Sequence, residues 1–179
     1  MSKKIVFTAG GTGGHILPAI HLMNHFSAQG YEVLLVTDYR GKKFISNISK
    51  FKSYEIITDT PTNKNIFKKI FSIFSILLSI FKSIKIIKKE KPDLIFGLGG
   101  YVSFPISFAS KFFGTPLVIY ESNTMMGRAN KFLLSFSNKI FLAGEFVMNL
   151  PKKYHNKAYI VGAILDKKII NYEAKKITD

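Results

Sequence analysis

Short runs rich in Ile, Val and Leu alternate with segments of helical period along most of the chain. The first run, Lys4–Ala9, predicts a buried strand, and the glycine-rich turn Gly10–Gly14 follows it. A helix is expected from about His15 to Gln29, with Gly30 placed to end it. The same pattern predicts strands at Glu32–Thr37, Tyr54–Thr58, Asp93–Phe96, Pro116–Tyr120, Lys139–Leu142 and Ala158–Val161, and helices at Asn65–Lys89, Pro105–Phe113 and Met125–Ser135.

The predicted strands lack strict alternation of apolar and polar residues. Strands covered by helices on both faces have this composition, because neither face meets water. Repeated strand–helix units therefore predict an α/β fold: an open, right-handed, mostly parallel Rossmann-like sheet with helices on both faces. The pattern fades from about Asp166. We expect one domain over residues 1–165 and a C-terminal extension or hinge over residues 166–179.

The predicted helix Asn65–Lys89 has an apolar arc of roughly 220°, although packing on a sheet needs only about 100° or somewhat more. Lysines flank this arc, as in helices that lie at a membrane interface. A loop or a protein partner covering the surplus face is the alternative. The longest charge-free run, Ile70–Phe81, is too short for the ~20 residues that span a bilayer. Membrane contacts are expected from Phe67, Phe71, Phe74, Phe81, Lys68 and Lys82.

The composition adds a strong positive charge to this pattern. The formal net charge is +15, and Arg40 and Arg128 are the only arginines. Such a balance favours anionic partners: phosphorylated ligands, acidic lipid or nucleic acid. The absence of cysteine excludes disulfides, cysteine-ligated zinc and thiol catalysis. Since the first strand begins close to Met1, we expect no secretory signal peptide and a cytoplasmic location.

The loop between the first strand and helix is the strongest functional signal. Four glycines within five residues, at Gly10, Gly11, Gly13 and Gly14, allow positive φ angles and close approach of a ligand to the backbone. The following helix start suits a diphosphate. A dinucleotide fingerprint is not met, since Ile16 stands at its third glycine position, and no Walker motif is present. A tight turn without a ligand is the alternative. Asp38, ending the second strand, is a weak candidate for the ribose-binding acid of an NAD enzyme.

His15 follows this loop. The positive end of the helix dipole disfavours an imidazolium, so His15 is a candidate base or diphosphate ligand; a residue that merely positions the loop is the alternative. His21 and His25 are one helical turn apart, but without a nearby acid a surface pair is expected rather than a metal site.

Two further loops end at the same predicted edge of the sheet. Gly97–Pro105 offers Gly99 and Gly100 for close approach and hydroxyls from Tyr101 and Ser103. After the strand Pro116–Tyr120, Glu121 and Asn123 can bind a sugar or phosphate, or can simply cap the next helix. Ligands of such sheets bind beyond the carboxyl ends of the strands. These loops therefore predict a diphosphate- or sugar-binding site that includes Gly11, His15, Gly99, Gly100, Tyr101, Ser103 and Glu121.

The motifs GGTGGHILPA, GLGGYVSFP, YESN and RANKFL, taken together, resemble the N-terminal half of MurG-like glycosyltransferases of family 28 over about Lys4 to Gly162. The resemblance implies half of a GT-B fold and a peripheral enzyme at the cytoplasmic face of the plasma membrane. It also implies inverting transfer of N-acetylglucosamine from UDP-GlcNAc to lipid I (undecaprenyl-diphospho-MurNAc-pentapeptide), giving lipid II, without a metal or other cofactor. In this family His15 is the candidate base, and UDP-GlcNAc contacts are implied for Thr12, Gly13, Gly14 and Asn123.

Two motifs differ from the family pattern. The family's His-Glu-x-Asn is here Tyr120-Glu121-Ser122-Asn123, and Gly162-Ala-Ile-Leu-Asp166 stands where Gly-Asn-Pro-Val-Arg is usual. The sequence contains no donor-binding second Rossmann domain, which predicts a truncated N-terminal half. One subunit of a split transferase, with the donor domain on a separate chain, is the second hypothesis. A non-catalytic basic membrane- or nucleic-acid-binding domain is the third; nucleic acid is not expected, because no aromatic-basic RNA motif is present.

Overall fold

The computed structural model describes residues 2–46, 51–57 and 66–166, and for residues 46 and 66–70 it describes the backbone alone. The predicted extension over residues 166–179 therefore lies outside the described residues from position 167 onward.

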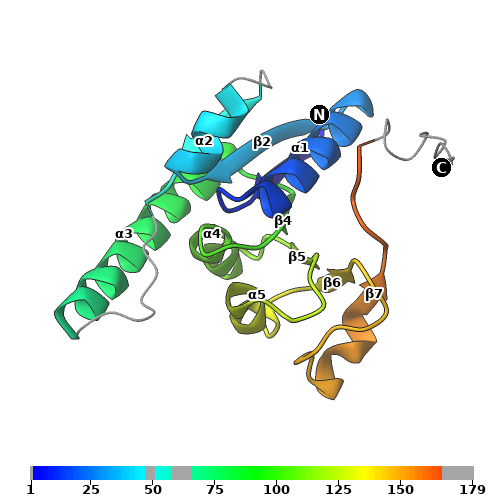
Figure 1. Cartoon of the computed structure of the whole chain (residues 1–179). Coiled ribbons are helices and arrows are strands. Elements are labelled where there is room, and N and C mark those ends of the chain that lie inside the picture. Colours follow the sequence, from blue (N-terminus) through cyan, green and yellow to red (C-terminus); the bar gives the residue numbers. More distant parts are fainter. Residues whose placement is uncertain (1, 47–50, 58–65, 167–179) are drawn as a thin grey trace, which may run out of the picture.

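A parallel sheet of seven strands forms the centre of the fold, in the order β3-β2-β1-β4-β5-β6-β7 (Figure 1). The Rossmann-like prediction is confirmed. The strands are β1 Lys4–Thr8, β2 Glu32–Thr37, β3 Lys52–Glu55, β4 Leu94–Gly97, β5 Leu117–Glu121, β6 Lys139–Leu142 and β7 Ala158–Ile160. The helices are α1 Gly13–Ala28, α2 Tyr39–Ser46, α3 Ile66–Glu90, α4 Ser103–Ser110 and α5 Arg128–Leu133, with 3₁₀ turns at Lys111–Phe113 and Lys152–Lys157.

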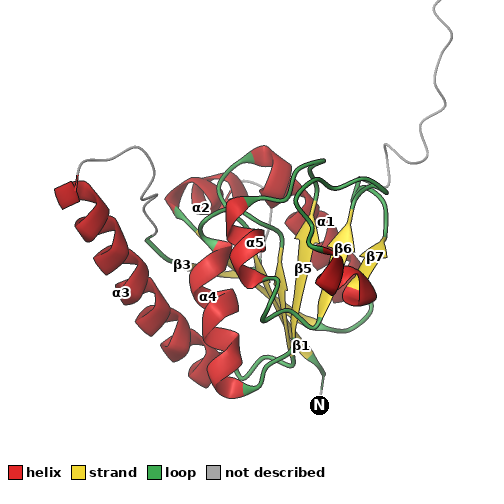
Figure 2. Ribbon diagram, turned by 90° about the horizontal axis from the view of Figure 1, so that it is seen from below, coloured by secondary structure: helices red, strands yellow, loops and turns green. Residues whose placement is uncertain are grey.

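Helices cover both faces of the sheet, with α3, α4 and α5 on one side and α1 on the other (Figure 2). Successive residues of one strand supply the two cores. Phe7 packs with Ile16 of α1, whereas Val6 belongs to the cluster that includes Ile106 of α4. Because side chains alternate across a strand, a strand buried on both faces must be apolar throughout. This explains the continuous Ile, Val and Leu runs of the sequence.

Helix α2 is absent from the predicted elements. Its sequence, YRGKKFIS, is mostly polar and contains Gly41. The helix is instead set by Asp38, whose Oδ1 accepts the Gly41 N–H at 2.9 Å and whose carbonyl accepts the Lys42 N–H. An aspartate just before a helix is a common N-cap residue, so Asp38 was the feature of the sequence that could have indicated α2.

Several predicted boundaries also differ from the structure, among them those of β3, α1, α4 and α5. Strand β3 lies earlier than Tyr54–Thr58, and α1 begins two residues before His15. Helix α5 begins at Arg128 rather than at Met125, because Met125 instead forms a bridge with Met148.

Helix α3 packs with its small polar residues inward and its large apolar residues outward. Ser72, Ser79 and Ser83 are buried, while Phe71 and Phe81 are 67% and 63% exposed. The α3 surface packs along α4, whose buried residues are also mostly small. The surplus apolar face that the sequence predicts is therefore present. Among the described residues, no helix is both long and apolar enough to cross a membrane.

The C-terminal end of α3 is tied to the sheet through Glu90. This buried carboxylate binds the ammonium groups of Lys4 at 3.1 Å and Lys52 at 2.8 Å, and it accepts a hydrogen bond from the Tyr54 hydroxyl. Burial raises the pKa of Glu90, but the hydrogen bonds from Lys52, Tyr54 and Lys4 outweigh it and hold the pKa at about 2. Glu90 thus links α3 to both β1 and β3.

Candidate functional site

The two glycine loops meet at the point where the strand order reverses. Strands β1 and β4 are neighbours, β2 lies beyond β1, and β5 lies beyond β4. The Gly10 N–H donates to the Gly99 carbonyl at 3.0 Å, so the loop after β1 contacts the loop after β4 directly. In doubly wound sheets the crevice at this reversal is the usual ligand site.

Several loop glycines are required by contacts within the chain. A Cβ on Gly100 would lie 2.8 Å from the Cα of Gly10, and Gly99 and Gly100 have φ angles of +98° and +79°. A Cβ on Gly11 would collide with the Asp38 side chain. The expectation of positive φ in the first loop is wrong: none of Gly10, Gly11, Gly13 and Gly14 has it. Close approach of the Gly100 backbone explains Gly10, and close approach of the Asp38 and Arg40 side chains explains Gly11.

Gly13 and Gly14 differ, because no contact within residues 2–46, 51–57 and 66–166 requires glycine at either position. A Cβ on Gly14 would meet no atom within 4 Å, and one on Gly13 would only touch Leu17 at 4.0 Å. Both lie in the first turn of α1, and the preceding residue, Thr12, makes no side-chain capping bond. The first amides of a helix have no intrahelical acceptor. The exposed end of α1 thus presents donors and the positive end of the helix dipole, an arrangement that binds anions.

The His15 ring lies against the second glycine loop. A Cβ added to Gly99 would stand 2.9 Å from His15 Cε1, so this glycine leaves room for the ring. His15 Nδ1 is buried and has no hydrogen-bond partner in the described part of the chain. The ring also lines a cavity of about 200 Å³ together with Tyr101, Asn123 and Arg128. An imidazole that lines a cavity is suited to exchanging a proton with a ligand.

Glu121 fixes the third loop, which runs from the end of β5 to the start of α5. Its side chain is almost fully buried and accepts four hydrogen bonds. Oε1 binds the Asn123 backbone N–H at 3.1 Å and the Asn123 amide group at 2.7 Å. Oε2 binds the Gly127 N–H at 2.7 Å and the Asn130 amide at 3.0 Å. The carboxylate therefore fixes Asn123 and the start of α5, and Asn123 itself is exposed at the cavity.

Ser103 has a similar internal contact. Its buried hydroxyl donates to the Gly100 carbonyl at 2.7 Å, closing the first turn of α4. Tyr101, two residues earlier, is half-buried and lines the cavity.

The structure adds two residues that the sequence analysis did not assign to the site. Arg128 is exposed at the cavity. Asn130 is buried there, and its Oδ1 has no partner among the described residues. The run Gly127-Arg-Ala-Asn130 at the start of α5 was the signal that could have indicated both residues. Glu121 is buried and accepts hydrogen bonds from Gly127 and Asn130 of this turn.

The remaining polar candidates have local partners. Asp38 caps α2 and pairs with Arg40 at 3.1 Å, which accounts for both of its oxygens. His25 lies 3.2 Å from the Gln29 amide, and His21 lies 4.0 Å from Asp166. Within residues 2–46, 51–57 and 66–166, no group of three or more His, Asp and Glu residues is arranged to hold a metal ion.

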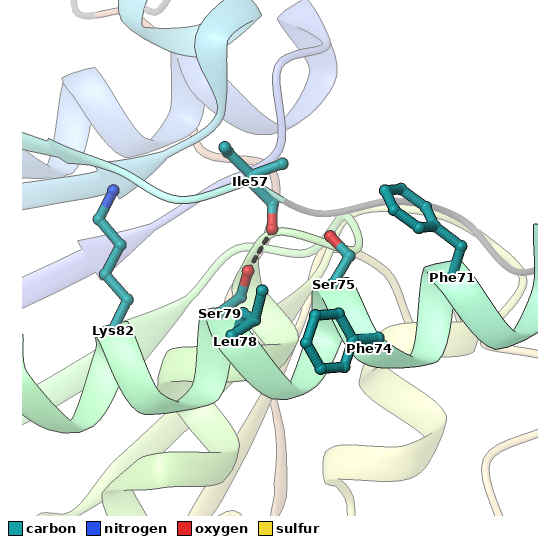
Figure 3. Close-up of a pocket in the computed structure, with 7 residues that line it drawn as sticks. All are labelled: Ile57, Phe71, Phe74, Ser75, Leu78, Ser79 and Lys82. Carbon is teal, nitrogen blue, oxygen red and sulfur yellow. Dashed lines mark hydrogen bonds between the residues drawn. The ribbon is translucent and has the colours of Figure 1, made fainter.

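A second hollow lies outside the loop cluster, between α3 and Ile57, which follows β3 (Figure 3). It has a volume of about 280 Å³ and is lined by Ile57, Phe71, Phe74, Ser75, Leu78, Ser79 and Lys82. The Ser79 hydroxyl donates to the Ile57 carbonyl and so joins α3 to the residues after β3. Of the predicted membrane contacts, Phe71, Phe74 and Lys82 line this hollow, and Phe81 is exposed further along α3. The side chains of Phe67 and Lys68 lie outside the described residues.

Comparison with known proteins adds a family to this geometry. The family model "Glycosyltransferase family 28 N-terminal domain" matches residues 5–142. A Rickettsia canadensis protein named UDP-N-acetylglucosamine–N-acetylmuramyl-(pentapeptide) pyrophosphoryl-undecaprenol N-acetylglucosamine transferase is 37% identical over 169 residues, covering 94% of this chain and 46% of that protein. A Pelagibacter ubique protein of the same name is 33% identical, with 96% and 47% covered. The chain thus spans about half the length of the curated relatives it matches.

Solved structures share the fold. Acinetobacter baumannii MurG has a TM-score of 0.78 at 24% identity and covers 97% of this chain, which corresponds to 50% of that chain. The UDP-GlcNAc 2-epimerase of Methanocaldococcus jannaschii has a TM-score of 0.64 at 15% identity, with 89% and 45% covered. Since a transferase and an epimerase share this architecture, the fold alone does not decide the reaction.

Proposed function

The chain belongs to the glycosyltransferase family 28 N-terminal domain family, and from this premise we propose that it is the acceptor-side half of a MurG-like inverting glycosyltransferase. The reaction is transfer of N-acetylglucosamine from UDP-GlcNAc to lipid I, the activity for which the curated relatives are named. One observation carries the proposal. At the open N-terminus of α1, a Cβ on Gly13 or Gly14 would clash with nothing in the described chain, and the neighbouring His15 has a buried nitrogen without a partner among the described residues.

We propose the following roles for the loops. His15 removes the proton from the 4-hydroxyl of the acceptor's MurNAc as this oxygen attacks the anomeric carbon of the donor sugar, and UDP leaves. Exposed amides at the start of α1 stabilise diphosphate charge, with Thr12, Gly13 and Gly14 on the donor side. Asn123 also contacts the donor.

The acceptor's diphosphate lies near Gly11, Gly99, Gly100 and Tyr101 in this proposal. Ser103 and Glu121 act indirectly, because their polar atoms are engaged in holding Gly100, Asn123 and the start of α5.

Transfer also needs a lobe that holds the uridine and the donor sugar. In the proposal that lobe is either continuous with this domain or a separate chain, as in a split transferase. Both arrangements place the donor across the carboxyl edge of the sheet, opposite His15.

We further propose that the domain docks on the cytoplasmic face of the plasma membrane through α3. The proposed acceptor is a lipid, and the outward Phe71, Phe74 and Phe81 offer apolar contact. Exposed lysines border them, including Lys82 and Lys85. Each basic residue near an anionic leaflet contributes about 1 kcal/mol. A membrane-binding domain without catalysis is the second candidate function, because the α3 face alone would support it.

The decisive experiment is complementation. The 179-residue chain is mixed with the separately expressed C-terminal half of the Rickettsia canadensis relative, and transfer of radiolabelled GlcNAc from UDP-GlcNAc to lipid I is measured. We expect activity in the mixture that His15→Ala abolishes. His25→Ala is the matched control, since His25 lies on the same helix outside the cavity. Full activity of the His15→Ala mixture would remove His15 from the mechanism, and activity in no pairing would favour the membrane-binding domain.

Membrane docking is tested separately by sedimentation with phosphatidylglycerol vesicles. Replacing both Phe74 and Phe81 by Ser is expected to reduce binding at least tenfold, because two exposed aromatic contacts are lost. Phe146→Ser is the control, as Phe146 is 72% exposed but lies outside α3. Equal sedimentation of the double variant and the wild type would exclude α3 as the docking face.

A further inference from the structure

The segment that leaves β7 follows a defined path over the face of the sheet covered by α1. After β7 the chain runs alongside α1 (Figure 1). Its residues alternate, with Gly162, Ile164 and Asp166 partly buried and the residues between them exposed. Such alternation is typical of an extended strap with one face against the protein. Residues 161–166 are called the exit segment below.

The Tyr120 hydroxyl makes two hydrogen bonds to this segment. It donates to the Gly162 carbonyl at 3.2 Å and accepts the Ile164 N–H at 3.3 Å. Tyr120 is 2% exposed, so these bonds are largely shielded from water. Burial raises the pKa of Tyr120, which keeps the hydroxyl protonated and able to donate. Gly162 has a φ of +82°, a turn that favours glycine and directs the chain back toward the sheet.

Two weaker contacts extend along the same segment. The Ile164 side chain packs against the core cluster that contains Phe7 and Tyr120. His21 of α1 lies 4.0 Å from Asp166, and a cavity of about 430 Å³ separates α1 from Ala163–Asp166 elsewhere. The Tyr120 hydroxyl therefore binds the first half of the segment, and the Ile164 side chain packs it onto the core.

Tyr120 and Glu121 are the last two residues of β5, and their side chains point to opposite faces of the sheet. Tyr120 binds the exit segment on the α1 face, while Glu121 binds the third loop on the other face. The Asn130 amide also links these two residues, since it donates to the Tyr120 carbonyl at 3.0 Å and to the Glu121 carboxylate. A shift of the end of β5 would therefore move the exit segment and the third loop together.

We propose that the Tyr120 hydroxyl is a latch that fixes the exit segment, and that the end of β5 couples the path of this segment to the geometry of the Glu121–Asn130 loop. Tyr120 is thus a positioning residue. That the loop binds an acceptor, and that the exit segment leads toward a donor lobe, rests on the proposed function; the latch itself does not.

The bond from position 164 to the Tyr120 oxygen uses the backbone N–H of Ile164. Proline has no N–H, so a proline at this position would remove the bond.

Amide hydrogen exchange on the full 179-residue chain tests the latch without any substrate. Tyr120→Phe retains the buried ring and removes the hydroxyl. We expect exchange at the Ile164 amide to accelerate about fivefold, the factor that corresponds to one typical net hydrogen bond. The amides of Asn123 and Gly127, which bind Glu121, are expected to accelerate by a smaller factor, while the Ile119 amide is unchanged. Tyr159→Phe, at an exposed tyrosine of β7, is the matched control.

A second variant changes the other partner of this hydrogen bond, the Ile164 N–H. Ile164→Pro removes the donor, so adding Tyr120→Phe to it is expected to change the midpoint of urea unfolding less than Tyr120→Phe does alone. Unchanged exchange at Ile164 in Tyr120→Phe, or fully additive effects, would overturn the latch. Faster exchange at Ile164 with an unaltered Glu121–Asn130 loop would overturn the coupling. The complementation assay with His15→Ala decides the proposed function independently.

Discussion

Gly14→Ala separates the stability of the fold from the binding of a ligand. Gly14 lies in the first turn of α1, and an added Cβ would meet no atom of the described chain within 4 Å. Alanine is favoured over glycine in helices by up to about 1 kcal/mol. For a chain of this size, 1 kcal/mol shifts the melting temperature by roughly 2–4 °C. The isolated chain is therefore expected to melt at the same temperature or slightly higher.

Ligand binding is expected to change in the opposite direction. If the amides at the start of α1 hold a diphosphate, the new methyl group occupies the space through which the phosphate approaches. A hydrogen bond to a charged group contributes about 1.5–3 kcal/mol, and each 1.4 kcal/mol is a factor of ten in affinity. Weakening one such bond is expected to lower affinity for UDP-GlcNAc or lipid I by at least about tenfold.

The assay pairs thermal unfolding of the isolated chain with calorimetric titration of the complemented form. Gly144→Ala is the control, because a Cβ there also meets nothing within 4 Å but the residue lies outside the glycine loops. A Gly14→Ala protein with wild-type affinity would refute the argument that Gly14 is glycine for the sake of a ligand. A Gly14→Ala protein that melts well below the wild type would refute the assignment of open space.

Three further substitutions test the internal contacts. Glu90 has its pKa lowered to about 2, so its contribution is present above pH 4.5 and is lost as the pH falls toward 2. Glu90→Gln is expected to remove about 3 kcal/mol at pH 7 and to flatten acid unfolding over this range, measured by urea denaturation at a series of pH values. Gly100→Ala is expected to lower the melting temperature, because φ is +79° and the Cβ would strike Gly10; an unchanged value would contradict the close approach. Glu121→Gln places an amide against N–H donors and is expected to cost about 1.5–3 kcal/mol, with faster exchange at Asn123; unaltered exchange would argue against its role.

The architecture was predictable because the strands are apolar on both faces. Val33–Val36 of β2 is a continuous apolar run, which is typical of a strand that is buried on both faces. The repeated strand–helix units then favour right-handed crossovers between parallel strands. Helix α2 was not predictable from periodicity, since its turns are polar and Gly41 interrupts it. Its start depends on one capping carboxylate, Asp38, which a search for hydrophobic pattern does not detect.

The edge of the sheet at which the three loops meet could be predicted from the sequence, but which of their residues face a cavity could not. Glycines and polar residues at strand ends indicated the edge at which the loops meet. Which of these residues face a cavity depends on partners six to nine positions away, as Gly127 and Asn130 do for Glu121. Likewise, the helical pattern of α3 indicated surplus apolar surface. It did not indicate that the serine side would face inward, because that choice depends on the small buried residues of α4.

The inward serines of α3 have a practical consequence for protein production. Among the described residues, α3 is held by the Ser79 hydroxyl on the Ile57 carbonyl, by Glu90 and by the buried Ile86 and Ile87, whereas Phe71, Phe74 and Phe81 are mostly exposed. Substitution of Phe71, Phe74 and Phe81 by lysine or glutamate therefore offers a protein that can be purified without detergent for crystallisation. The glycine loops would remain intact for ligand soaking.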